Sequence, residues 1–189
     1  MTPDKHLGVD LYVRADAPIV DRRTVVIERL ERLERRERID EYSVQLWPRA
    51  ISLDLMRRVD ESPIVDAVRE FETWAEQCDR YLSPCFDVST THSMITDESD
   101  RLLVLPVLCV AVFSDGSLVD VAPSSDGDSV RTVEDLLADV AAGTVPTSEA
   151  FSGDMPSGAE PDQRGLAGNA NPLKSSSVTS VFHRPERGE

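Results

Sequence analysis

The sequence is short of cysteine, histidine and aromatic residues, and each shortage excludes a class of site. The three cysteines, Cys78, Cys85 and Cys109, form no CxxC pair and leave one unmatched. This pattern suits a reducing compartment and argues against a disulfide framework. The three histidines are scattered, without further ligands at zinc-binding spacing. We therefore expect no metal site and no bound cofactor.

Long hydrophobic runs are also missing. The longest, LLVLPVLCVAVF, has 12 residues and contains Pro106, so it is too short to span a bilayer. The first ten residues, MTPDKHLGVD, lack the charged-then-apolar pattern of an export signal. We expect a soluble, cytoplasmic protein without a membrane partner.

Positive charge is scarce, and lysine is nearly absent. Asp and Glu number 35 against 20 Lys and Arg, giving a formal net charge of −15, and Lys5 and Lys174 are the only lysines. Dense carboxylates keep a surface hydrated where high salt screens their repulsion, whereas arginine is retained for ion pairs. The composition predicts a halophilic protein from a salt-accumulating organism, with an acidic mesophilic protein as the alternative. Its negative charge disfavours nucleic acid, although screening in molar salt weakens that argument.

Arginine is nevertheless concentrated in residues 22–38, RRTVVIERLERLERRER, which contain seven of them. Apolar residues at helical spacing within this stretch predict a helix with a narrow buried stripe, and Asp21 is suited to cap its start. Three glutamates stand four residues before an arginine, an arrangement that contributes roughly 0.2–0.5 kcal/mol per pair. The pairs are Glu28–Arg32, Glu31–Arg35 and Glu34–Arg38. We predict a self-neutralised, solvated face here, with a nucleic-acid-binding helix as the alternative.

The remaining patterns predict an α/β fold in one domain, residues 8–143. Strands are expected at 8–14, 41–47, 86–94, 101–113 and 118–122, with helices after Asp21, from Ser62 to before Pro84, and from Thr132 to Gly143. A strand, helix and strand in so short a span imply a parallel pair with a right-handed crossover. The whole forms a mixed sheet of about five strands with three helices. Pro106 conflicts with a continuous strand because proline cannot donate to the ladder, so a bulge or an edge position is expected there.

Residues 144–189 differ in character from the rest of the chain. They hold five of the nine glycines and five of the twelve prolines, with sparse apolar residues and no period. Such a segment buries too little surface to offset its ordering entropy, which predicts a disordered tail. Within it, SSVTSVF is a candidate docking segment or added edge strand.

No motif in the sequence identifies catalysis. Walker, GxGxxG, HExxH and nucleophile-elbow patterns are absent, and Cys85 has no nearby basic group to activate it. Ligands of α/β proteins gather at the carboxyl ends of parallel strands and at helix N-termini. A possible anion or partner site there consists of Arg14, Arg22, Arg23, Trp47 and Arg49. The alternative is that these are unrelated surface residues.

The predicted order strand–helix–strand–helix–strand–strand–strand–helix resembles the thioredoxin-like arrangement. The loop ADAPIVDRR stands where that fold carries its CxxC motif, and LPVLCVAVFSDGSLVDVAP is similar to its proline-led hairpin. Because no cysteine matches the motif, the resemblance implies a protein without redox activity.

Three segments resemble a haloarchaeal family of small acidic proteins that are commonly labelled helix-turn-helix domain proteins. They are VDLYVRADAP, VIERLERLERRERIDEYSVQLWPR and LLVLPVLCVAVFSDGSLVDVAPSSDG. The resemblance covers residues 8–143 and implies DNA binding, since a helix followed by IDEYSVQLW is similar to a recognition helix that runs into a wing.

Three hypotheses follow. The first is a non-enzymatic, intracellular regulatory or interaction module whose partner is a protein. The second is a helix-turn-helix-type DNA-binding transcription regulator. Against it, a strand and a proline-containing loop stand where the first helix of that motif belongs. The third is a thioredoxin-like protein without redox activity.

Overall fold

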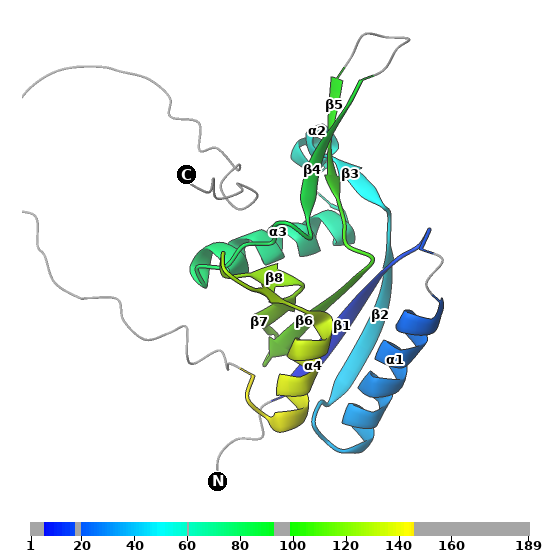
Figure 1. The fold of residues 1–189 in the computed structure, drawn as a ribbon, viewed down its shortest axis with the longest axis vertical. Helices are drawn as coiled ribbons and strands as arrows, with labels where there is room; N and C mark the ends of the chain where they lie inside the picture. The colour runs from blue at the N-terminus through cyan, green and yellow to red at the C-terminus, as the bar shows by residue number, and fades with distance from the viewer. Residues whose placement is uncertain (1–5, 18–19, 60, 93–98, 146–189) are drawn as a thin grey trace, which may run out of the picture.

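The computed structural model of the protein describes residues 6–17, 20–59, 61–92 and 99–145. Within them the chain forms a four-stranded sheet, a three-stranded sheet, a two-stranded ladder and four helices. Helices cover both faces of the larger sheet, and the three-stranded sheet projects from one end of it (Figure 1). The predicted α/β class with a mixed sheet is confirmed. The predicted tail lies almost wholly outside the described residues.

The larger sheet has the order β2-β1-β6-β7. Its strands are β1 (Leu7–Arg14), β2 (Glu41–Trp47), β6 (Leu108–Ser114) and β7 (Ser117–Ala122). As predicted, β1 and β2 are parallel, with helix α1 (Val20–Arg35) between them in the chain. Strand β6 runs antiparallel to β1, and β7 antiparallel to β6. Strand β2 therefore forms one edge of the sheet.

Alternation along β1 sends its side chains into two separate cores. Val9, Leu11 and Val13 face the layer formed by α1 and α4 (Val133–Ala142), where they pack with Leu30 and Leu136 among others. Tyr12 faces the opposite layer, which α3 (Pro63–Gln77) forms. Each fully buried side chain of this size contributes roughly 1.5–3 kcal/mol. The two cores fix the sheet between its helix layers.

The core beneath α3 is aromatic. Tyr12 and Phe71 meet edge to face with ring centroids 5.5 Å apart, and Trp47 and Phe86 do so at 5.9 Å. Trp74 donates its indole N–H to the Val119 carbonyl at 3.1 Å. Such pairs are worth about 0.5–1.5 kcal/mol beyond the area they bury. Helix α3 is thus held firmly to the sheet.

The single apolar strand predicted at 101–113 is two strands. Strand β5 (Ser99–Val104) belongs to the smaller sheet with β3 (Ala50–Ser52) and β4 (Asp87–His92), whereas β6 belongs to the larger one. The break falls at Pro106, which has no N–H to donate, and the preceding Leu105 N–H bonds instead to the Arg49 carbonyl at 2.9 Å. The chain passes between the two sheets at this point.

Other boundaries also differ from the expected ones. Helix α3 ends at Gln77, before Asp79 adopts a positive φ of 52°, instead of continuing to Pro84. A short helix, α2 (Leu53–Arg58), and strand β3 were not predicted, and neither was the ladder of β8 (Ser124–Ser125) with β9 (Val130–Arg131). Helix α4 does carry the expected capping box of Thr132 and Asp135, and it ends at Gly143 with φ 73°.

Glu72 is a buried carboxylate on α3. Burial raises its pKa from 4.5 to about 7, nearby Glu76 adds to the rise, and Arg69 opposes it. The folded state thus binds the proton more tightly than the unfolded state does. Ionisation therefore opposes folding fully above about pH 7, and the penalty disappears as the pH falls to about 4.5.

We predict that Glu72→Gln raises the free energy of unfolding by about 1–3 kcal/mol at pH 8, because it removes the buried charge. The gain should vanish near pH 4.5. Urea denaturation across this pH range measures it, and Glu61→Gln, an exposed residue just before the same helix, is the control. A gain that is independent of pH would contradict this assignment.

Candidate functional site

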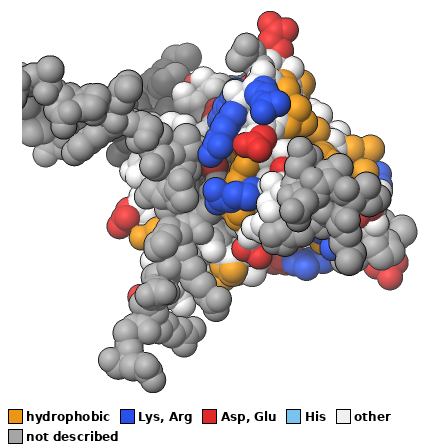
Figure 2. Space-filling model, turned by 90° about the horizontal axis from the view of Figure 1, so that it is seen from above, with side chains coloured by type: hydrophobic (Ala, Val, Ile, Leu, Met, Phe, Trp, Pro, Cys, Tyr) orange, Lys and Arg blue, Asp and Glu red, His pale blue; other side chains and the backbone are white. Residues whose placement is uncertain are grey.

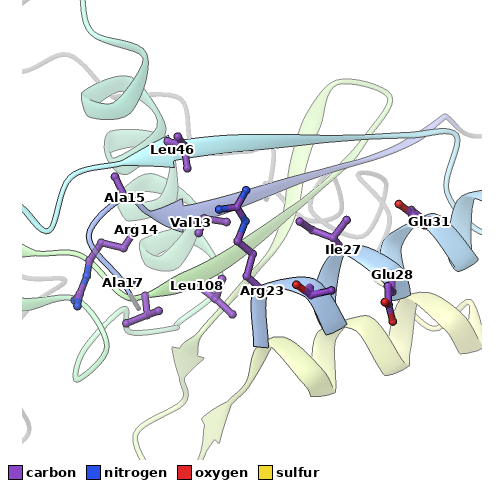
Figure 3. Close-up of a pocket in the computed structure, with 12 residues that line it drawn as sticks. Val13, Arg14, Ala15, Ala17, Arg23, Ile27, Glu28, Glu31, Leu46 and Leu108 are labelled. Atoms are coloured by element: carbon purple, nitrogen blue, oxygen red, sulfur yellow. The ribbon is translucent and has the colours of Figure 1, made fainter. Parts of the chain in front are cut away.

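An open groove lies between α1 and the carboxyl ends of β1 and β2. It has a volume of about 670 Å³. Its apolar lining is formed mainly by Val13, Ile27, Leu46, Val107 and Leu108. Figure 3 shows that Val13, Leu46 and Leu108 come from the strands and Ile27 from α1. We refer to this feature as the α1–β2 groove.

The groove exists because α1 leaves the carboxyl end of the outer strand, β2, uncovered. Leu46 is 59% exposed and Val44 is 39% exposed, although both lie on the face of β2 that α1 covers further along. Tyr42, two residues earlier on the same face, packs at the margin of the core. The exposed apolar side chains therefore lie beside the free edge of β2, which pairs with β1 alone among the described strands.

A cationic side chain enters this apolar groove. Arg23, in the first turns of α1, points toward Val13 and Leu46 (Figure 3). Within the described part of the chain it has no carboxylate within 4 Å. An unpaired guanidinium beside apolar walls is suited to an anionic group of a bound molecule, because it offers several donors in one plane.

The rest of the groove carries both signs of charge. Arg14, at the end of β1, donates from Nε to Asp16 Oδ1 at 2.8 Å. Glu28 and Glu31 line the wall further along α1, and Glu31 pairs with Arg35 at 3.6 Å. Among the coloured side chains on the face shown in Figure 2, basic, acidic and hydrophobic ones likewise lie next to one another.

The structure brings together two of the five residues expected at an anion or partner site. Arg14 and Arg23 line the groove, whereas Arg22 turns toward α4 and holds both carboxylate oxygens of Glu134 at 2.9 and 3.0 Å. Trp47 is 1% exposed and donates from Nε1 to the Pro106 carbonyl at 3.0 Å, so it belongs to the core. Arg49 is exposed beyond β2, outside the groove lining.

Sequence reasoning missed the apolar part of the groove. The signal was present in the alternation of Tyr42, Val44 and Leu46 along a short strand. It could have identified the site only with the knowledge that β2 is an edge strand. The face of this strand that meets solvent is set by the position of α1, which the local pattern does not specify.

The expected ion pairs along α1 form only in part. Glu31 and Arg35 pair, but Glu28 and Arg32 do not lie within 4 Å of each other. Glu34 and Arg38 cannot pair in the expected way, because α1 ends at Arg35 and Glu37 adopts a positive φ of 55°. Of the three ion pairs expected on this face, only Glu31–Arg35 is thus confirmed among the described residues.

Unpaired arginines follow one side of α1. This side of α1 is next to α4, because Arg22, which lies on it, contacts Glu134 on α4. Arg29 and Arg32 continue it at helical spacing, and Arg36 lies just past the end of the helix. We refer to these last three residues as the arginine row. None of the three has a carboxylate within 4 Å among the described residues.

Helices α2 and α3 are consecutive and separated only by residues 59–62. This is the described pair whose spacing is compatible with a helix-turn-helix. The second helix of such a motif reads DNA with its exposed side, yet the exposed side of α3 carries Asp66, Glu70 and Glu76. Carboxylates repel the phosphate backbone, so this side of α3 is poorly suited to bind DNA.

The described residues contain no group of three His, Cys, Asp or Glu side chains arranged to hold a metal ion. They also include no helix long and apolar enough to cross a membrane. Burial raises the pKa of the Cys85 thiol, and it holds the pKa of the fully enclosed Cys109 well above its usual range. Both thiols are consequently poor nucleophiles near neutral pH.

The chain was compared with known protein families and proteins. Residues 1–144 match a family described as a helix-turn-helix domain. No curated protein and no solved structure matches the chain. The match ends two residues beyond α4 and covers most of the chain.

The adjacent residues Leu46 and Trp47 provide a direct test of which side chain belongs to the surface. Trp47→Phe removes the donor to the partly buried Pro106 carbonyl and should lower the free energy of unfolding by about 1–3 kcal/mol. Leu46→Ala, on the exposed face, should change it by less than about 0.5 kcal/mol. Urea denaturation of both variants measures the difference. Equal losses would show that Leu46 is a core residue and that the groove is closed in solution.

Proposed function

Because the chain belongs to a helix-turn-helix domain family, we propose that it is a regulatory protein that acts by binding a macromolecule, not by catalysis. The partner is a protein, and an extended segment of it occupies the α1–β2 groove. The observation that carries this proposal is the exposed apolar edge of β2 beside the unpaired Arg23.

The edge of β2 supports binding of an extended segment. An edge strand has a row of backbone N–H and C=O groups that a peptide can pair with, while alternate side chains of the peptide enter neighbouring pockets. Here every second side chain of an added strand would face the groove and contact Val44, Leu46 and Ile27. Backbone pairing supplies affinity, and the apolar lining selects apolar side chains.

Arg23 supports a requirement for one anionic group. Its guanidinium lies among apolar side chains, where a carboxylate would form a charge-assisted hydrogen bond. Glu28 and Glu31 disfavour a second acidic group further along α1. The preferred segment therefore has alternating apolar residues and one acidic residue near the carboxyl end of β2.

Several further observations support the wider setting of this proposal. The raised pKa values of Cys85 and Cys109 favour a non-enzymatic role, since catalytic cysteines need lowered ones. A net charge of −15 with two lysines favours the cytoplasm of a halophile, as does the resemblance to haloarchaeal proteins. The order β2-β1-β6-β7, with α3 opposite α1 and α4, favours a thioredoxin-like arrangement without its redox motif.

DNA binding is the second candidate, and two observations favour it. One is membership of the helix-turn-helix domain family. The other is the arginine row, whose guanidinium groups have no carboxylate partner within the described residues. Because the exposed side of α3 is acidic, DNA binding would occur through the arginine row and not through α3.

Selection from a library of extended seven-residue peptides, displayed in molar potassium chloride, tests the protein-partner proposal. We expect the selected peptides to share alternating apolar residues and one acidic residue. Leu46→Asp should weaken their binding at least tenfold, equivalent to about 1.4 kcal/mol. Leu55→Asp is the matched control, because Leu55 is also exposed (52%) but lies on α2. Equal affinity for Leu46→Asp and wild type would contradict the proposal.

Titration of duplex DNA across salt concentrations separates the two candidates. If the partner is a protein, the wild-type chain should show no steep dependence of DNA affinity on salt. DNA binding would instead be established by a steep slope of log affinity against log salt concentration. In the triple variant Arg29→Gln, Arg32→Gln, Arg36→Gln, the magnitude of that slope should then fall by about 0.9 for each lost phosphate contact. Arg57→Gln with Arg58→Gln, which removes exposed arginines from α2, is the control.

A further inference from the structure

Strand β2 is an edge strand without the usual protection against pairing. Such edges are normally blunted by charged residues, proline or a bulge. Between Tyr42 and Trp47 there is no charged residue and no proline, and the register with β1 is regular from Gly8–Glu41 to Arg14–Trp47. The opposite edge strand, β7, has both an irregular register with β6 and the buried Asp120.

A segment of the same chain has the composition of a strand that fits this edge. Residues 176–182, SSVTSVF, are uncharged and rich in β-branched residues, and their seven residues equal the length of β2. Val178, Ser180 and Phe182 alternate with the other residues of the segment, so they would share one face of a strand and could meet the face of β2 that carries Val44 and Leu46. Prolines at 172 and 185 flank the segment and would limit a strand to this length.

We propose that residues 176–182 pair with β2 of the same chain as an added strand and fill the α1–β2 groove. This inference rests on the proposed function, because it takes the groove to be a site for an extended segment. The partner then competes with the chain's own segment. Self-occupancy also shields an apolar edge that would otherwise favour aggregation.

The connection is long enough for this pairing. The chain leaves the domain at the end of α4, where the Cβ position of Gly143 would lie 3.9 Å from Arg38 Nη1, beside the start of β2. The 31 steps from Val145 to Ser176 give a flexible chain a root-mean-square span of about 30 Å, more than the roughly 24 Å length of α1. Linkage at such distances provides an effective concentration near millimolar, so a short strand suffices.

Amide hydrogen exchange of the full chain tests this inference. The variant Val178→Asp, Phe182→Asp places charge on the face that would enter the groove. We expect the amides of β2 that point to its free edge to exchange at least tenfold faster than in the wild-type chain. Leu173→Asp, an apolar-to-acidic change outside the segment, is the matched control, and β7 amides should be unchanged in every variant. Equal β2 exchange in wild type and the double variant would overturn the proposal.

Light scattering and peptide binding resolve the remaining outcomes. A wild-type dimer that dissociates in the double variant would show pairing with a second copy and would overturn pairing within one chain. Binding of the selected peptides should strengthen in the double variant, because the competing segment is removed. Faster β2 exchange in a variant that binds no peptide would support the added strand while contradicting the proposed function. Peptide binding without faster β2 exchange would support the proposed function and contradict the added strand.

Discussion

The structure depends on burying β1 from both sides. Val9 and Leu11 are enclosed by α1 and α4 while Tyr12 is enclosed by α3, so β1 lies inside the sheet with β2 and β6 on either side. The crossover through α1 connects β1 to its parallel neighbour β2 and packs over the strands it joins. Apolar side chains of α1 share a core with those of β1 and β6, and the carboxyl end of β2 remains exposed. The α1–β2 groove is thus a consequence of the topology, not an isolated surface feature.

The same helix separates two kinds of surface. One side of α1 faces the groove with Arg23, Ile27 and Glu31, and the other carries the arginine row toward α4. The first combines apolar contact with a single unpaired cation, which suits a protein segment. The second concentrates positive charge without apolar contact, which suits phosphates. The two candidate functions therefore involve opposite sides of one helix, so variants of each side distinguish them.

Local patterns were sufficient for much of the fold, and tertiary context was needed for the site. The alternation in β1 and the capping box of α4 depend on neighbouring residues, so the sequence specifies them. The ion pair expected between Glu34 and Arg38 failed because it assumed a helix that continues past Arg35. Alternation along a strand places Trp47 and Leu46 on opposite faces, but it does not show which face a helix covers. The sequence alone therefore could not assign Trp47 to the core and Leu46 to the surface. The sequence did show that Pro106 conflicts with a continuous strand. It did not show that the preceding strand, β5, pairs with β3 and β4 in a second sheet.

The central claim is that the α1–β2 groove receives an extended segment. Methyl NMR of the full chain during titration with a selected peptide measures this most directly. Ile27, Val44 and Leu46 line or adjoin the groove, and Leu55 on α2 is an exposed reference outside it. The account predicts that the largest shifts occur at the methyl groups of Ile27, Val44 and Leu46, while Leu55 is unchanged. Shifts concentrated at Leu55, or at residues beside the arginine row, would contradict it.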